Sequence, residues 1–60
     1  MDIDDVIRQL KETSGTTKYI EILRTLSDEE IKTLINREYA EQPTFIKAIL
    51  YQGFKKQQAG

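Results

Sequence analysis

The stretch Ser27-Asp28-Glu29-Glu30 carries several signals for the start of a helix at one point. A serine can accept a hydrogen bond from the free backbone N–H groups, and a glutamate three residues later can bond back to the serine N–H, which is the capping-box pattern. Leu26 and Ile31 stand on either side in the positions of a hydrophobic staple. The sequence therefore predicts that one helix ends near Leu26 and another begins directly after it.

Two amphipathic segments precede this boundary. In residues 2–13 the apolar side chains recur at i, i+3, i+4 and i+7, which is the spacing of one helical face. Gly15 can then take a left-handed position after that helix, and Thr16 or Thr17 can cap the next one. We expect this second helix over residues 17–26, because the neighbouring Ile22 and Leu23 break the alternation of a strand.

Two further helices are predicted after the capping box. The third should run to about Tyr39 and bury that residue with Ile31, Leu34 and Ile35. Pro43 separates the third helix from the fourth, since the residue before a proline avoids the helical region, and proline suits the first turn of a helix. The pattern predicts an all-α fold, a compact bundle of three to four short helices.

The sequence also predicts where the fourth helix ends and a C-terminal tail begins. We expect the fourth helix to end near Phe54, with Gly53 either marking that end or admitting a close neighbour. Residues 1–54 then form a single helical domain, and residues 55–60 form a flexible, mildly basic C-terminal tail.

The size of the chain limits its stability. A chain of 60 residues buries only about 60% of its unfolded surface, and its core supplies about 3–5 kcal/mol. The sequence has no Cys and no His, which removes disulfides and most metal sites as additional stabilisers. Self-association or binding to a larger protein is the remaining route.

Composition also restricts the classes of function. Without Cys and His the usual nucleophile–base pairs are absent, the scattered glycines form no phosphate-binding loop, and the acidic clusters lack calcium-loop spacing. We therefore predict a protein that is not an enzyme and uses no cofactor and no metal. The acidic N-terminus and the lack of a long apolar run predict a cytoplasmic protein without a membrane segment, of the kind made by small reading frames of bacteria or phages.

The fourth helix carries more apolar surface than one packing face requires. Its large apolar side chains spread over about 180° of the helix, whereas one core-facing stripe needs about 100°. Either neighbours contact this helix on two sides, or part of its surface binds another molecule. Glu38, in the apolar arc of the third helix, is expected to reach water or a lysine; the alternative is a partner-facing acid.

These observations predict a non-enzymatic helical interaction module, a small regulator, adaptor or inhibitor that presents an apolar face of its last helix to a larger protein or to itself. Aromatic residues and arginine are the usual anchors of such contacts. The candidate partner-binding residues are Phe45, Ile49, Tyr51, Phe54, Lys47 and Arg37.

The alternative is a small DNA-binding regulator, because the third and fourth helices have roughly helix-turn-helix proportions. Its last helix would face the duplex, and Lys55 and Lys56 would contact phosphates. The net charge of −1 disfavours this alternative, although residues 31–60 alone carry +3. We therefore rank nucleic-acid binding second.

Overall fold

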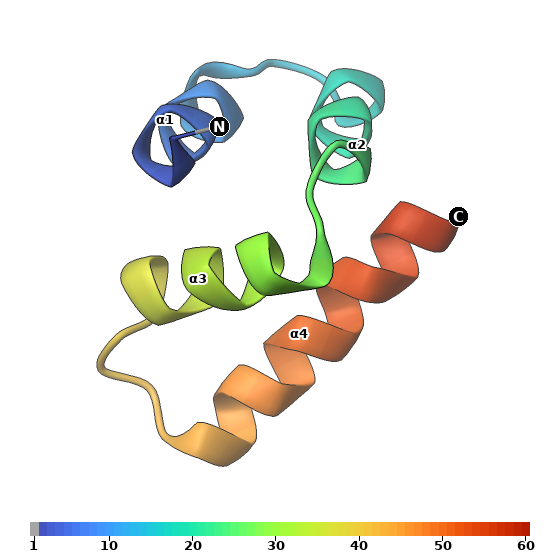
Figure 1. Ribbon diagram of the computed structural model, residues 1–60. Coiled ribbons are helices and arrows are strands. Elements are labelled where there is room, and N and C mark those ends of the chain that lie inside the picture. The colour runs from blue at the N-terminus through green and yellow to red at the C-terminus, as the bar shows by residue number, and fades with distance from the viewer. Residues whose placement is uncertain (1) are drawn as a thin grey trace.

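Four α-helices joined by short turns make up the computed structural model, which describes residues 2–60 (Figure 1). They are α1 (Ile3–Glu12), α2 (Thr16–Arg24), α3 (Asp28–Glu38) and α4 (Thr44–Ala59). None of these 59 described residues lies in a strand, so the predicted all-α bundle of short helices is confirmed. Residue 1, which the predicted domain included, lies outside the described part of the chain.

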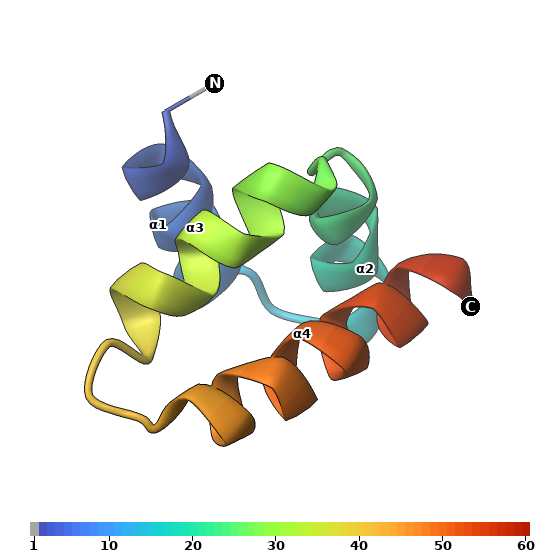
Figure 2. The same ribbon diagram turned by 60° about the horizontal axis from the view of Figure 1, so that its bottom comes forward.

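Helices α2 and α3 each contact α1 and α4 but do not pack against each other. Helix α1 packs against both of them, and so does α4, but α1 and α4 do not pack against each other. Figure 2 shows α4 along one edge of the molecule, with α1 on the far side of α3. One side of α4 therefore faces the bundle and the opposite side faces outward.

The buried core comes entirely from the first three helices and the turn after α2. Leu23 is completely buried, and Val6 and Ile31 are each 1% exposed. Helix α4 contributes no buried residue, and only Leu50, Tyr51 and Phe54 pack against the core as partly buried side chains. The remaining core residues are Leu10, Leu26, Leu34 and Ile35.

The predicted capping box is present at the start of α3. The Glu30 N–H donates to the Ser27 hydroxyl oxygen at 3.2 Å, and the Ser27 N–H donates to the Glu30 carboxylate at 2.9 Å. The Ser27 hydrogen bonds lower the pKa of Glu30, because they stabilise the ionised carboxylate. Leu26 and Ile31 on either side are both buried, so this junction also enters the core.

The turn between α1 and α2 depends on a glycine. Gly15 has a φ of +100°, a conformation that residues with a Cβ rarely adopt, so the positive φ expected of it is confirmed. Its ψ of 138° is not that of the predicted left-handed residue after α1, whose C-cap is Thr13. The prediction that Thr16 or Thr17 caps α2 is wrong. Gly15 itself is the capping residue, without a side-chain hydrogen bond, since both threonines already lie within the helix.

The C-terminal boundary predicted at residue 54 is also wrong, because α4 continues to Ala59. Contacts with α2 hold this extension: the Gln58 side-chain amide donates to the Leu23 carbonyl at 2.5 Å and to the Leu26 carbonyl at 3.0 Å. The Arg24 guanidinium donates back to the Gln58 carbonyl at 3.2 Å. Gly53 therefore lies inside the helix and does not mark its end.

Candidate functional site

The outward side of α4 exposes large apolar side chains. Phe45 is 66% exposed and Ile49 is 63% exposed, although both belong to the apolar arc that the sequence shows. Helices α2 and α3 both pack against α4, yet they bury none of its residues and leave Phe45 and Ile49 exposed, so α4 is not a central helix that neighbours cover all round. We call this surface the α4 outer face. Residues at positions i, i+4, i+7, i+8 and i+11 lie on the same side of a helix. The α4 outer face therefore consists of Phe45, Ile49, Gln52, Gly53 and Lys56.

A depression runs beside the α4 outer face, and we call it the aromatic groove. Its two adjoining hollows share Tyr19, Tyr39 and Phe54. The hollow next to α4 has a volume of about 390 Å³ and is completed by Ile49, Leu50, Gly53 and Gln57. The hollow toward α1 has a volume of about 210 Å³ and is completed by Ile7, Leu10, Lys11, Leu34 and Glu38.

The two tyrosines of this groove come from the first part of α2 and from the residue that directly follows α3. Tyr39 was predicted to be buried, but it is 37% exposed, because α3 ends at Glu38 and the Tyr39 backbone leaves the helical conformation. Tyr19 comes from the first part of α2 and is half-buried. Burial raises the pKa of Tyr19, and the nearby Tyr39 hydroxyl raises it further.

Glu38 forms the polar end of the groove. Its carboxylate accepts a salt bridge from the Lys11 ammonium of α1 at 3.0 Å, and its side chain remains 29% exposed. The prediction that Glu38 reaches a lysine is therefore confirmed. This ion pair is the charged part of a lining that is otherwise apolar or aromatic.

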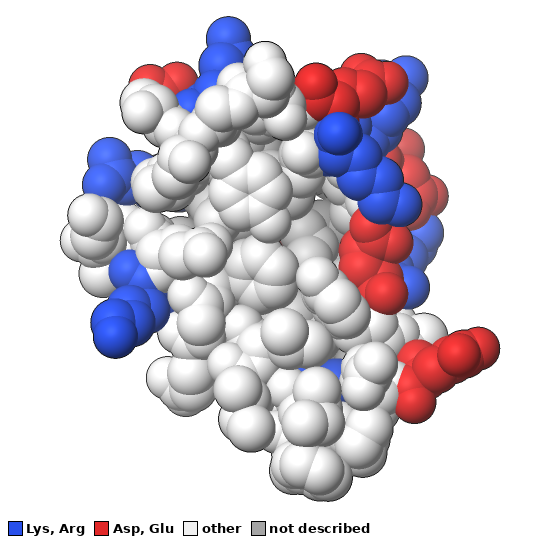
Figure 3. Space-filling view, turned by 180° about the vertical axis from the view of Figure 1, so that it is seen from behind, with Lys and Arg blue, Asp and Glu red and all other residues white. Residues whose placement is uncertain are grey.

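Charged side chains gather at the borders of one face of the molecule. Seen from behind, a broad uncharged area is bounded by Lys and Arg on one side and by mixed acidic and basic residues on the other (Figure 3). Depletion of charge at the centre with charged and polar residues at the rim is typical of protein contact surfaces, since the rim stays hydrated while the centre is covered.

The six predicted partner-binding residues do not form one surface. Ile49 and Phe54 line the aromatic groove, and Phe45 lies one turn before Ile49 on the α4 outer face. Tyr51 instead lies on the side of α4 that packs on α3, where the Lys32 ammonium stands 5.7 Å from its ring centre. Three of the six thus share one region with the groove.

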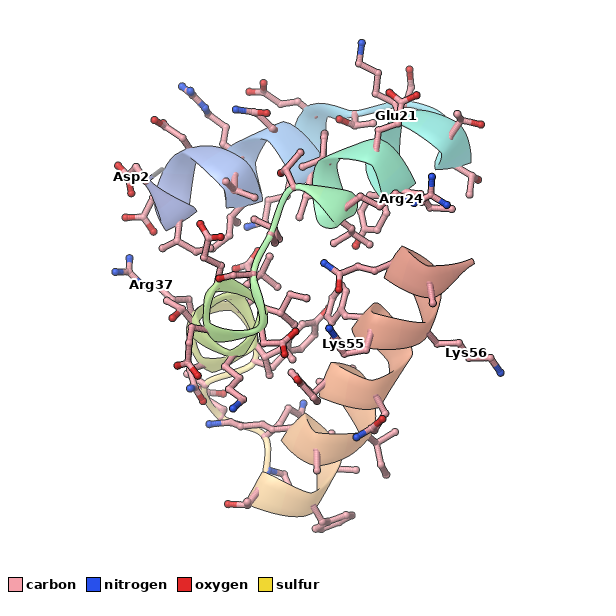
Figure 4. All side chains as sticks on the ribbon, turned by 45° about the vertical axis from the view of Figure 1, so that its right-hand side comes forward. Asp2, Glu21, Arg24, Arg37, Lys55 and Lys56 are labelled. Carbon is pink, nitrogen blue, oxygen red and sulfur yellow. The ribbon has the colours of Figure 1, made fainter. Side chains whose placement is uncertain are left out.

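The two basic candidates lie elsewhere. Lys47 is half-buried and its ammonium donates to the Asn36 side-chain oxygen at 3.3 Å, on the α3 side of α4. Arg37 pairs with Asp4 of α1, and Figure 4 shows it on the opposite side of the molecule from Lys56. Neither cation therefore borders the α4 outer face.

Several residues of this region were missed by sequence reasoning. Tyr39 is predicted to be buried because its helical spacing fits an apolar stripe, but periodicity does not show where such a stripe extends beyond the helices that cover it. Gly53 was weighed only as an end-marker or a close contact, yet nothing lies within 4 Å of the Cβ position that a substitution would create. Gln57 carried no signal at all.

Metal clusters and membrane-spanning helices are absent from the part of the chain that is described. Across residues 2–60, no three or more Asp and Glu side chains gather where a metal ion could be held. Nor does any of the four helices have the length and apolar character needed to cross a membrane. The chain matches no protein-family model, no curated protein and no solved structure.

Proposed function

We propose that this protein is a small helical interaction module that binds another protein chain through the α4 outer face and the adjoining aromatic groove. The observation that carries the proposal is the exposure of Phe45 and Ile49 on a helix that contributes no buried residue. Covering an exposed apolar side chain of this size is worth about 1.5–3 kcal/mol. The proposal requires no catalytic group and no cofactor.

The aromatic groove provides a concave site beside this apolar surface. Tyr and Phe supply a large contact area at a low cost in conformational entropy, since only two side-chain torsions are ordered. Tyr19, Tyr39 and Phe54 surround a hollow that is open to solvent. A cavity of about 150 Å³ is enough for benzene, so the 390 Å³ hollow has room for an aromatic or branched side chain of a partner.

The arrangement of lysines supports this proposal over DNA binding. Lys55, one of the two lysines expected to contact phosphates, forms an ion pair with Asp28 at the start of α3. The hydrogen bond to Asp28 raises the pKa of Lys55, because the carboxylate stabilises the ammonium. Phosphate binding would have to compete with that carboxylate.

The test compares two aspartate variants of the full chain. Ile49→Asp places a charge on the α4 outer face, whereas the control Gln9→Asp adds the same charge to the exposed surface of α1, which does not pack on α4. Circular dichroism should show equal helix content for both. Complexes with the protein itself or with a captured protein should be lost for Ile49→Asp only; equal binding by both variants would contradict the proposal.

The salt dependence of binding distinguishes protein docking from DNA binding. Apolar docking should change little between 50 and 200 mM salt, whereas binding to several phosphates weakens by about 10³–10⁵ over that range. A salt-sensitive shift of duplex DNA that is lost in Lys55→Ala and Lys56→Ala would favour the DNA-binding alternative instead.

A further inference from the structure

We propose that the occupant of the α4 outer face is a second copy of this chain, with the two α4 helices packed antiparallel about a twofold axis that passes close to Ile49. This inference rests on the proposed function and identifies the bound protein as another copy of the same chain. It follows from the order of large, medium and small side chains along the face.

The α4 outer face is complementary to itself in shape. Phe45, Ile49 and Gly53 follow one another at intervals of four residues, so they form one row along the helix. A twofold axis at the middle residue of this row places Ile49 against its own copy and places Phe45 of each chain against Gly53 of the other. The largest exposed side chain of α4 then meets the position that has no side chain.

The position opposite Phe45 is hollow. A Cβ added at Gly53 would meet no atom within 4 Å, and the 390 Å³ hollow of the aromatic groove opens beside it. Leu50, Phe54, Tyr19 and Tyr39 form its walls. An incoming phenylalanine ring would therefore be surrounded by apolar and aromatic side chains, which is how an anchor residue binds.

Charge is complementary in the same orientation. Glu41 lies just before α4 and Lys56 lies near its end; both are exposed, and neither takes part in an ion pair within residues 2–60. Antiparallel pairing brings Glu41 of each chain to the end of α4 that carries Lys56 in the other chain, so the dimer has two such pairs. In Figure 4 Lys56 points away from the bundle, whereas Lys55 lies between α4 and α3.

A parallel pair would lack these features. It would place Phe45 against Phe45, leave Gly53 against Gly53, and bring like charges together at both ends. It would also align the two helix dipoles, while antiparallel helices oppose them. Because α4 is 16 residues long, the contact is short, and we expect a dimer that dissociates on dilution.

Single cysteines test the geometry, since the chain contains no cysteine of its own. Under mild oxidation, Ile49→Cys should form a disulfide-linked dimer rapidly, because the twofold axis places this position beside its own copy. Phe45→Cys alone should not, but a mixture of Phe45→Cys with Gly53→Cys should give the mixed dimer. Rapid self-linking of Phe45→Cys, or none by Ile49→Cys, would overturn the antiparallel arrangement.

Charge reversal gives an independent test. Glu41→Lys and Lys56→Glu should each weaken the dimer several-fold in analytical ultracentrifugation at low salt, because each places like charges opposite each other. The double variant should restore the wild-type dissociation constant. Equal dissociation constants for all four proteins would contradict the arrangement.

The oligomeric state separates this inference from the proposed function. Wild-type chain should sediment at twice its 7.0 kDa mass at high concentration, and Gly53→Leu, which fills the hollow, should remain monomeric. A wild-type chain that stays monomeric at every concentration overturns the dimer, even if it binds a different protein through Ile49. Loss of both self-association and all Ile49-dependent binding overturns the proposed function as well.

Discussion

Gly15 and Gly53 lie in backbone conformations that give the same substitution opposite effects. Gly15 has a φ of +100°, and Gly53 lies inside α4; neither has an atom within 4 Å of an added Cβ. Steric collision therefore plays no part at either position, and only the backbone conformation decides the result.

We predict that Gly15→Ala destabilises the fold by about 1–3 kcal/mol, because alanine is strained at this φ. Gly53→Ala should stabilise the monomer by about 1 kcal/mol, because alanine is the better helix former. Urea unfolding at low protein concentration measures both. Equal effects of the same sign would show that the φ of Gly15 is not fixed as described.

The capping box gives a pH dependence that can be assigned to one residue. The pKa of Glu30 is lower in the folded chain than its usual value, so its stabilising effect is complete above that usual value and is lost as the pH falls through the folded pKa. The wild type should therefore lose more stability on acidification below about pH 4.3 than Glu30→Gln, whose side chain does not titrate. Parallel pH profiles of the two proteins would contradict this assignment.

At the level of the elements, the last turn of α4 is held by a distant helix end. The final carbonyl groups of a helix have no partner within it. The Gln58 amide donates to the Leu23 carbonyl in the last turn of α2 and to the Leu26 carbonyl in the turn that follows it, and the Leu23 carbonyl also accepts from the Leu26 N–H at 3.1 Å. The two helix ends therefore stabilise each other.

We predict that Gln58→Ala lowers the free energy of unfolding by about 1–3 kcal/mol, since two hydrogen bonds are lost. The neighbouring exposed Gln57 provides a control, and Gln57→Ala should change stability by less than about 0.5 kcal/mol. Chemical denaturation followed by circular dichroism measures both. A neutral Gln58→Ala would mean that water replaces the amide at no cost.

For the whole molecule, stability depends on a small core to which α4 adds no buried residue. Leu23 is 0% exposed, and Leu→Ala substitutions in cores cost about 2–5 kcal/mol. That is comparable to the about 3–5 kcal/mol available to a chain of this size. A single core truncation can therefore remove most of the folded population.

We predict that Leu23→Ala is largely unfolded at 25 °C, whereas Ile49→Ala, at a position that is 63% exposed, changes monomer stability by less than about 0.5 kcal/mol. Far-UV circular dichroism and thermal melts at low concentration distinguish the two. A large loss of stability for Ile49→Ala at dilution would mean that Ile49 serves the fold of the single chain and does not form a docking surface.

Features that depend on local hydrogen bonds and helical periodicity can be predicted from the amino-acid sequence. The Ser27–Glu30 box, the positive φ of Gly15 and the four helices all follow from groups within a few residues of one another. The spacing of the apolar residues also shows that the apolar face of the last helix is unusually broad. It does not show which part of that face points outward.

Which side of each helix is covered depends on how the helices pack together. The end of α4 depends on contacts between residues more than 30 positions apart, so no local pattern marks it. Tyr19, Tyr39 and Phe54 form one groove because three helices converge there, while Lys47 and Arg37 turn to other sides. The periodicity of a helix gives the width of its apolar face, but the packing of its neighbours decides how much of that face remains exposed.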